Sequence, residues 1–282
     1  MMIRSVFAAA LIATAAHADS YPDAKAVVSV GGPVTEVIYA LGEEDRIAAR
    51  DTTSVYPEAA LTLPDVGYMR RLSAEGVLSV SPDLIIARDT SGPQEAIEQL
   101  KAAAIPIVFT RDGFSGDAVV ENIRTVGDAL GVADKADLLA TQVEGDLTAL
   151  SAAVSNLTEK RKVMFVLSLD GGRLNVAGRD TGAHGIIDLA GGENVMAEAF
   201  TGYKLVDAEA VITAAPDLIL MMDGRGNHAA RKDEVLGLPF VALTPAGETA
   251  AFETIPAAAL GFGPRTAQFG QQLFDLFYAR AG

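Results

Sequence analysis

Short apolar runs alternate along the first part of the chain with longer stretches in which apolar residues recur every three or four positions. The runs at 27–30, 46–49, 84–87 and 107–110 predict strands, and the periodic stretches between them predict helices. Strands that alternate with helices pair in parallel through right-handed crossovers. The first part therefore predicts a parallel α/β sheet.

The same pattern starts again after residue 161. Each half of the chain is therefore expected to form its own small α/β sheet. The strands expected in the second half are 163–167, 218–221 and 240–243, and the helices are 182–189, 208–213 and 266–278.

Residues 117–156 separate the two halves and contain no proline and almost no strand signal. Apolar residues follow helical spacing in two runs on either side of Gly131, which predicts two helices, the second of them long. The long helix either joins two lobes as a rigid strut or belongs with its neighbour to one lobe. Periodicity alone leaves both arrangements open.

One passage occurs twice, because residues 74–87 and 208–221 align at a constant offset of 134 with half of the fourteen positions identical. A Gly-Tyr pair precedes each copy, Gly67-Tyr68 and Gly202-Tyr203. A period this long does not indicate a solenoid. It predicts two similar lobes that contribute the same elements to a shared ligand cleft.

The first 18 residues have the pattern of a signal peptide: Arg4, a short apolar stretch and the Ala16-His17-Ala18 cleavage site. The apolar stretch is shorter than the roughly 20 residues of a membrane-spanning helix. No Cys follows it, so no lipid anchor is expected. The sequence predicts an exported, periplasmic protein that starts at Asp19 and does not insert stably into a membrane.

The chain carries a net charge of −15, and without Arg4 the 21 remaining Lys and Arg stand against 37 Asp and Glu. This acidity argues against nucleic acid or an anionic membrane surface as a partner. The absence of Cys from the sequence excludes disulfides, thiolate metal sites and cysteine nucleophiles.

Ligands of open α/β sheets bind beyond the carboxyl ends of the strands, and the loops expected there are rich in Tyr and Arg. Tyr68 is the leading candidate, since a phenol can bind ferric iron when nearby cations hold it as phenolate. Arg70 and Arg71 follow within three residues. The alternative is a loop aromatic packed under the cleft, with solvated arginines.

Several segments resemble the periplasmic haem-binding proteins of bacterial haem ABC importers, and the similarity covers nearly all of the mature chain. The Pro-Asp-Leu and Ala-Gly-Gly-x-Asn pieces are shared with the wider class that binds cobalamin and siderophores. The Gly-Tyr-x-Arg segment is the piece that points to haem. The segments that carry the resemblance are 29–36, 65–76, 82–85, 190–195 and 263–266.

The resemblance implies a class III binding protein with two Rossmann-like α/β lobes, a single long helix between them and a ligand cleft between the lobes. Residues 19–133 would form the N-terminal lobe, 134–158 the connecting helix and 159–282 the C-terminal lobe. The class shows little hinge motion, which favours the strut for the long helix.

The resemblance also implies roles for individual residues. Tyr68 would be the axial ligand of ferric haem b, Arg70 its basic neighbour, and Arg225 an arginine of the second lobe that faces the haem. His184 and His228 are candidates for a further ligand from the second lobe. The other residues expected beside the haem are Met69, Arg71, Arg179, Tyr203, Lys204, Met221 and Met222.

Glu75 and Glu209 occupy matching positions in the two copies of the repeat. Each carboxylate can be explained by its place in the first turn of a helix. The resemblance implies a second role, in which one Glu per lobe docks a monomeric binding protein onto a permease dimer with its ATPase.

Two other functions remain open at this stage. The same fold with another cargo would bind cobalamin or a ferric siderophore. An exported enzyme would have to use Asp180, Asp223 and His228, but the sequence has no Gly-x-Ser-x-Gly, HExxH or P-loop motif. The sequence therefore favours a binding protein that catalyses nothing.

Overall fold

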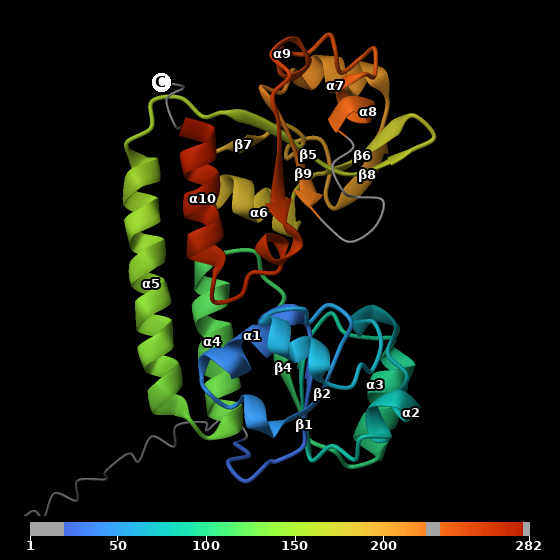
Figure 1. The fold of residues 1–282 in the computed structure, drawn as a ribbon, viewed down its shortest axis with the longest axis vertical. Coiled ribbons are helices and arrows are strands. Elements are labelled where there is room, and N and C mark those ends of the chain that lie inside the picture. Colours follow the sequence, from blue (N-terminus) through green and yellow to red (C-terminus); the bar gives the residue numbers. More distant parts are fainter. Residues whose placement is uncertain (1–19, 224–231, 279–282) are drawn as a thin grey trace, which may run out of the picture.

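The computed structural model describes residues 20–223 and 232–278, and the strands within these ranges form two sheets in two lobes (Figure 1). The N-terminal sheet has the order β2-β1-β3-β4 and is parallel throughout, as predicted. Its strands are β1 (Val27–Val30), β2 (Ile47–Arg50), β3 (Leu84–Arg88) and β4 (Ile107–Thr110). Its helical elements are α1 (Gly32–Ala40), η1 (Glu44–Arg46), η2 (Glu58–Thr62), η3 (Met69–Arg71), α2 (Ala74–Leu78) and α3 (Gln94–Ala102).

The C-terminal sheet has the order β10-β9-β5-β6-β8, and β7 adds to β5. Its strands are β5 (Lys162–Asp170), β6 (Arg173–Ala177), β7 (Glu193–Asn194), β8 (Tyr203–Val206), β9 (Leu218–Asp223) and β10 (Phe252–Pro256). Its helical elements are α6 (Gly182–Leu189), α7 (Ala208–Ala214), α8 (Lys232–Leu236), α9 (Pro245–Glu248) and η4 (Ala257–Leu260).

Two features of the C-terminal sheet differ from the prediction. The strand predicted at 240–243 is wrong, because this apolar run forms turns between α8 and α9. On the side of β9 away from β5, the parallel strand is β10. β6 and β8 were not predicted, and they run antiparallel to their neighbours. The hairpin from β5 to β6 turns at Gly171 and Gly172, whose φ angles of 56° and 78° lie in the region that glycine adopts readily.

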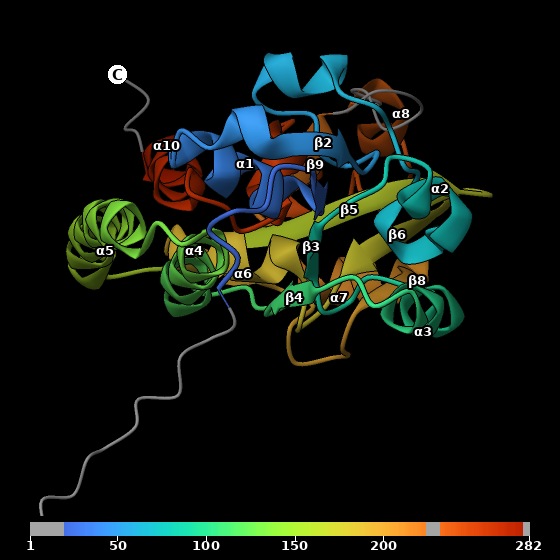
Figure 2. The ribbon, with the colours of Figure 1, turned by 90° about the horizontal axis from the view of Figure 1, so that it is seen from below.

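Two helices follow the N-terminal sheet, as the spacing predicts: α4 (Gly116–Leu130) and α5 (Ala133–Ser155). The left-handed Gly131, at φ 72°, ends α4 and lets the chain reverse into α5. α5 runs along both lobes, with α4 beside its first part and α10 (Thr266–Tyr278) beside its second part (Figures 1 and 2). Because its buried residues recur at steps of four and three, one apolar stripe faces the lobes along its length.

One apolar core runs through both lobes beneath these helices. Alternate residues of β3 and β5 enter it from the two sheets, such as Ile86 and Phe165, because successive side chains of a strand point to opposite faces. The other faces pack separate cores, under α2 and α3 in one lobe and under α7, α8 and α9 in the other. In the described ranges no helix is long and apolar enough to cross a membrane.

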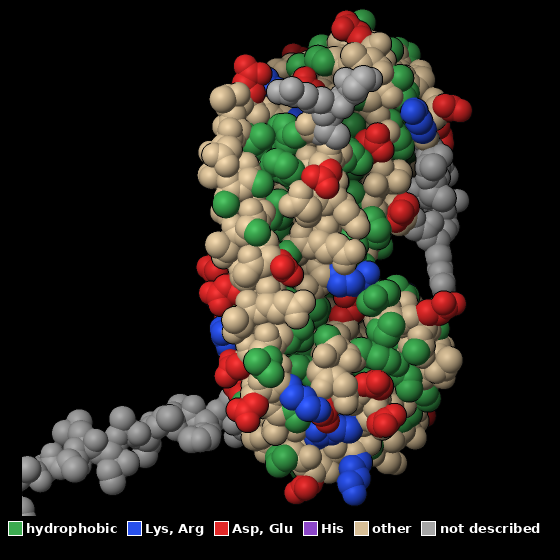
Figure 3. All heavy atoms as spheres, turned by 60° about the vertical axis from the view of Figure 1, so that its left-hand side comes forward, with side chains coloured by type: hydrophobic (Ala, Val, Ile, Leu, Met, Phe, Trp, Pro, Cys, Tyr) green, Lys and Arg blue, Asp and Glu red, His purple; other side chains and the backbone are tan. Residues whose placement is uncertain are grey.

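The lobes also contact each other directly where α1 meets the chain before α10. Arg265 donates two hydrogen bonds to Glu36, from Nε at 2.9 Å and from Nη2 at 3.0 Å. Arg88, at the carboxyl end of β3, donates from Nη1 to the Gly261 carbonyl at 2.7 Å. Figure 3 shows the notch at mid-height where the two lobes meet. These contacts fix how the lobes face each other.

Candidate ligand-binding site between the lobes

Backbone hydrogen bonds hold the turn that carries Tyr68 on both sides. The Gly67 carbonyl accepts from the Thr52 amide at 2.9 Å, and the Met69 carbonyl accepts from the Gly92 amide at 2.9 Å. Tyr68 itself is 41 % exposed. The fold therefore presents this phenol to solvent from a fixed piece of backbone, as a ligand to an incoming group requires.

Arg70 and Arg71 extend the same turn as part of η3, and both are exposed. Neither guanidinium pairs with a carboxylate in the part of the chain that the structure describes. The positive charge of Arg70 also acts on the phenol of Tyr203, which belongs to the other lobe. Arg70 is therefore available to a ligand, and its charge reaches a phenol of the second lobe.

Tyr203 begins β8, and its hydroxyl lies at the N-terminus of α6. The Thr181 side chain and the Ala183 backbone amide lie near enough to the phenol to affect its pKa. Burial raises the pKa of Tyr203, while these two neighbours and the charge of Arg70 oppose the rise. The structure thus brings Tyr203 and Arg70, both predicted as site residues, to one place between the lobes. The supporting roles of Thr181 and Ala183 were missed, although a Thr before a helix is a recognisable N-cap.

Lys204 and Arg179 do not join this group. Lys204 follows Tyr203 in β8, so its side chain leaves the opposite face of the sheet, where Nζ lies 5.3 Å from the centroid of the Phe200 ring. Arg179 is exposed and lies 3.9 Å from Glu198, which is too long for a firm ion pair. A place beside the ligand remains a prediction for both.

His184 occupies the first turn of α6, and its backbone amide donates to the Thr181 hydroxyl at 3.0 Å. Its Nδ1 atom is buried and has no hydrogen-bond partner among the described residues. This unpartnered nitrogen leaves His184 a candidate ligand. Within the same ranges no three His, Cys, Asp or Glu side chains gather as a metal site would require.

The three methionines expected to face the ligand are mostly inside the lobes. Met69 is 8 % exposed and packs in the N-terminal core with Val66 and Leu72, so it anchors the Tyr68 turn from below. Met221 is 1 % exposed in the C-terminal core, and Met222 packs partly buried against the shared core. Met69 and Met221 are thus covered by their own lobes, and contact of the three methionines with the ligand stays a prediction.

Arg225 and His228 lie outside the described residues. The face of the site that the stretch 224–231 would contribute therefore stays a prediction from the sequence.

Glu75 and Glu209 take equivalent positions in the two lobes. Each is exposed in the first turn of a short helix, α2 or α7. The residue before each helix caps it: the Ser73 hydroxyl accepts from the Gly76 amide, and Asp207 accepts from the Ala210 amide. The structure thus repeats the local geometry of the two carboxylates, and their docking role stays a prediction.

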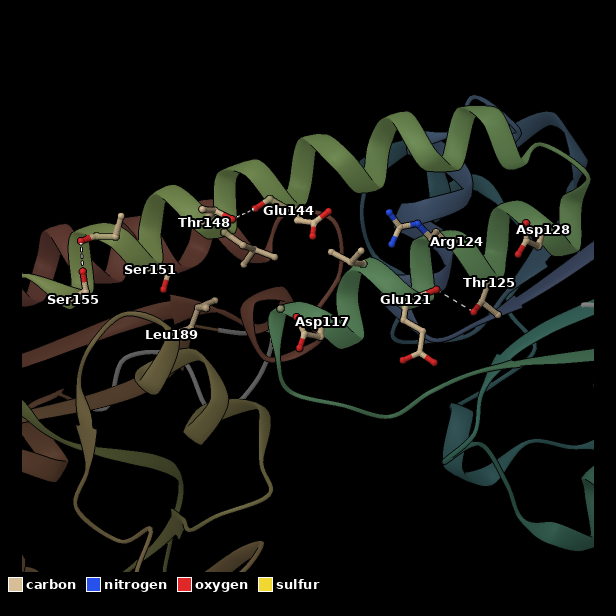
Figure 4. A pocket seen from close by; sticks show the side chains of 14 residues that line it. Asp117, Glu121, Arg124, Thr125, Asp128, Glu144, Thr148, Ser151, Ser155 and Leu189 are labelled. Carbon is tan, nitrogen blue, oxygen red and sulfur yellow. Dashed lines mark hydrogen bonds between the residues drawn. The ribbon is translucent and has the colours of Figure 1, made fainter. Parts of the chain in front are cut away.

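A hollow that is lined by none of the predicted site residues lies along α4 and α5 (Figure 4). This groove has a volume of about 980 Å³, and its acidic side chains are Asp117, Glu121, Asp128 and Glu144. Arg124 is its basic residue, and its Nε already donates to Asp137 at 3.0 Å. Such a lining would repel an anionic ligand, so the groove is a poor substitute for the site between the lobes.

Two α/β lobes joined along one long helix are the architecture of the two-lobed substrate-binding proteins of class III. The family model described as "Periplasmic binding protein" matches residues 27–259. The chain therefore belongs to the periplasmic binding protein family.

Solved structures and curated relatives place the chain within this family. The apo form of the periplasmic heme-binding protein RhuT from Roseiflexus sp. RS-1 is 37 % identical with a TM-score of 0.85, covering 92 % of this chain and 99 % of that chain. The periplasmic heme-binding protein BhuT in complex with two hemes is 36 % identical with a TM-score of 0.85, at coverages of 89 % and 96 %.

The curated relatives carry other names. The Vitamin B12-binding protein of Vibrio parahaemolyticus is 31 % identical over 216 residues, which cover 75 % of this chain and 77 % of the relative. The ABC transporter substrate-binding lipoprotein YvrC of Bacillus subtilis is 29 % identical, at coverages of 74 % and 67 %.

Proposed function

We propose that this protein captures ferric haem in the periplasm and delivers it to an ABC importer in the inner membrane. The observation that carries the proposal is the exposed Tyr68 phenol on a fixed turn, followed by the guanidinium groups of Arg70 and Arg71, which pair with no carboxylate among the described residues. The heme-binding names of RhuT and BhuT, at 37 % and 36 % identity, support it.

In this proposal each group has a separate task. Phenolate oxygen is a recognised protein ligand of haem iron, and Tyr68 would supply it. Arg70 would stabilise the deprotonated phenol or pair with a propionate, since guanidinium groups bind carboxylates well. Burial of the porphyrin between the lobes would supply most of the binding free energy. The role is binding and delivery, without turnover of the cargo.

Tyr203 is the proposed contact from the second lobe, because its hydroxyl lies near the N-terminus of α6 and the positive charge of Arg70 acts on it. Arg225, His184 and His228 are proposed as further contacts with the haem. The protein is proposed to act as a monomer.

Titration with hemin tests the proposal. The wild-type protein should give a Soret band together with the charge-transfer band of high-spin ferric iron bound by tyrosinate. Tyr68→Phe should lose the charge-transfer band. Tyr56→Phe is the matched control, because Tyr56 is 44 % exposed in the same lobe and its ring contacts Arg265. A Tyr68→Phe spectrum equal to that of wild type would refute the assignment of the ligand.

Cobalamin is the second candidate cargo, and the observation in its favour is the name of the Vibrio relative at 31 % identity. Titration of the same protein with cyanocobalamin distinguishes haem from cobalamin as the cargo. Under the haem proposal, cyanocobalamin in excess should not displace hemin. Displacement at matched concentrations would favour cobalamin.

A further inference from the structure

Asp65 ties the turn that carries Tyr68 to the end of β2. Its Oδ1 atom accepts from the Gly67 amide at 2.8 Å and from the Thr52 hydroxyl at 3.2 Å. Its Oδ2 atom accepts from Nη1 of Arg50 at 2.7 Å. One carboxylate therefore joins the sheet to the residue that directly precedes the phenol.

The backbone follows the same connection. Residues Arg50 and Asp65 form a parallel bridge, in which Arg50 donates to Pro64 at 2.9 Å and Val66 donates to Arg50 at 3.0 Å. Gly67 is then held at both polar groups, its N–H by Asp65 and its carbonyl by Thr52. Its φ of 97° is a conformation that favours glycine. The direction in which the chain leaves Gly67 is therefore fixed before Tyr68 begins.

The exposure of the ion pair between Arg50 and Asp65 indicates its role. The side chain of Arg50 is 10 % exposed and forms a buried anchor, whereas that of Asp65 is 39 % exposed. An ion pair with one half-exposed partner contributes little to stability. Holding a ligand in place is a different task, because residues behind a metal ligand orient it and change metal affinity without touching the metal.

We propose that Asp65 is a positioning residue for Tyr68, which sets the direction of the phenol through Gly67 and thereby increases haem affinity. The inference rests on the proposed haem function. It concerns a residue that does not touch the haem and acts only through the Tyr68 turn.

A double-mutant cycle with hemin as the probe tests this action. Asp65→Ala, Tyr68→Phe and the double variant are compared with wild type by hemin affinity and by the tyrosinate-to-iron band. Asp65→Ala should weaken hemin binding about 10- to 100-fold, as loss of an orienting partner does, and should shift or broaden the band. In the Tyr68→Phe background, Asp65→Ala should change hemin affinity by less than about twofold. This is the deviation from additivity expected of independent sites.

Two further variants sharpen the test. Asp83→Ala is the matched control, because Asp83 also holds backbone amides in this lobe, those of Lys25 at 2.7 Å and Ala26 at 2.9 Å. It should leave both hemin affinity and the band unchanged. Asp65→Asn keeps an acceptor for the Gly67 amide and loses the charge, so its affinity should fall between wild type and Asp65→Ala. If Asp65→Ala does not fold, Asp65→Asn carries the same cycle.

Two results would overturn the inference. One is an unchanged affinity in Asp65→Ala. The other is an equal loss whether Tyr68 is present or replaced by Phe, which would mean a general effect on the lobe. A wild-type protein that gives no tyrosinate-ligated spectrum would instead refute the proposed function. The two failures are therefore distinguishable.

Discussion

Replacing Arg265 by Met should loosen the contact between the lobes. The guanidinium forms two hydrogen bonds to Glu36, at 2.9 and 3.0 Å, and its central carbon lies 3.4 Å from the centroid of the Tyr56 ring. The side chain of Glu36 is 9 % exposed and that of Arg265 is 24 % exposed. The substitution leaves a buried carboxylate without its partner.

The size of the effect follows from this burial. Removing one partner of a buried ion pair costs about 3–5 kcal/mol, and the partial exposure of Arg265 favours the lower end. For a protein of this size, a loss of about 3 kcal/mol lowers the melting temperature by about 6–12 °C. The double variant Glu36→Gln/Arg265→Met removes the unpaired charge and should recover a large part of the loss.

The loss of stability caused by Arg265→Met should also depend on pH. Burial raises the pKa of Glu36, and the hydrogen bond and charge of Arg265 oppose the rise. A raised pKa means that protonation stabilises the native state below the ordinary value and that this contribution is lost as pH rises through the raised value. Without Arg265 the pKa rises further, so the cost of the substitution should be largest at neutral pH.

Thermal unfolding followed by circular dichroism checks the size of the stability loss and its dependence on pH. The measurements are made at pH 7 and near the ordinary glutamate pKa of about 4.3. The difference in melting temperature between wild type and Arg265→Met should shrink at the lower pH. An equal difference at the two pH values, or a shift at neutral pH below about 2 °C, which corresponds to less than 1 kcal/mol, would refute the reasoning.

Two other predictions concern the ligand and the partner. Tyr203→Phe should keep the tyrosinate-to-iron band, because Tyr68 is expected to supply it. Loss of the band in hemin titrations would assign the iron to Tyr203. Glu75→Lys/Glu209→Lys should abolish haem-stimulated ATP hydrolysis by the reconstituted importer while leaving hemin affinity unchanged, and unaltered stimulation would contradict the docking role.

The sequence predicted the elements whose signals are local. The bounds of β4, α6 and α10 agree with the residues predicted from periodicity, and the N-terminal sheet is parallel as alternation implies. The repeat correctly indicated two lobes with matching helices at Glu75 and Glu209. Apolar spacing and helix ends depend on neighbours in the sequence, so they can be read directly.

The errors in the predicted strands of the C-terminal sheet have two origins. Residues 240–243 are apolar because Val241 is buried under the sheet from a turn, while the true strand β10 alternates weakly and includes the exposed Glu253. The Asp170-Gly171-Gly172 hairpin carried a recognisable signal that was overlooked.

The contact between the lobes could not be predicted from the sequence, for a different reason. Glu36 and Arg265 are 229 positions apart, and nothing in their local sequence indicates that they meet. The short link from Asp65 to Gly67 could have been found, since an Asp two residues before a Gly is typical of a turn closed by the side chain.

Among the described residues, the hydrogen bonds between the lobes come, on the C-terminal side, from a short late segment that holds Gly261 and Arg265. A chain that emerges from an export channel with its N-terminus first can form the parallel sheet of its first lobe long before this segment appears. The hydrogen bonds between the lobes can therefore form only near the end of translocation. Nascent chains stalled before residue 261 would contain the strands of both sheets and would lack these hydrogen bonds.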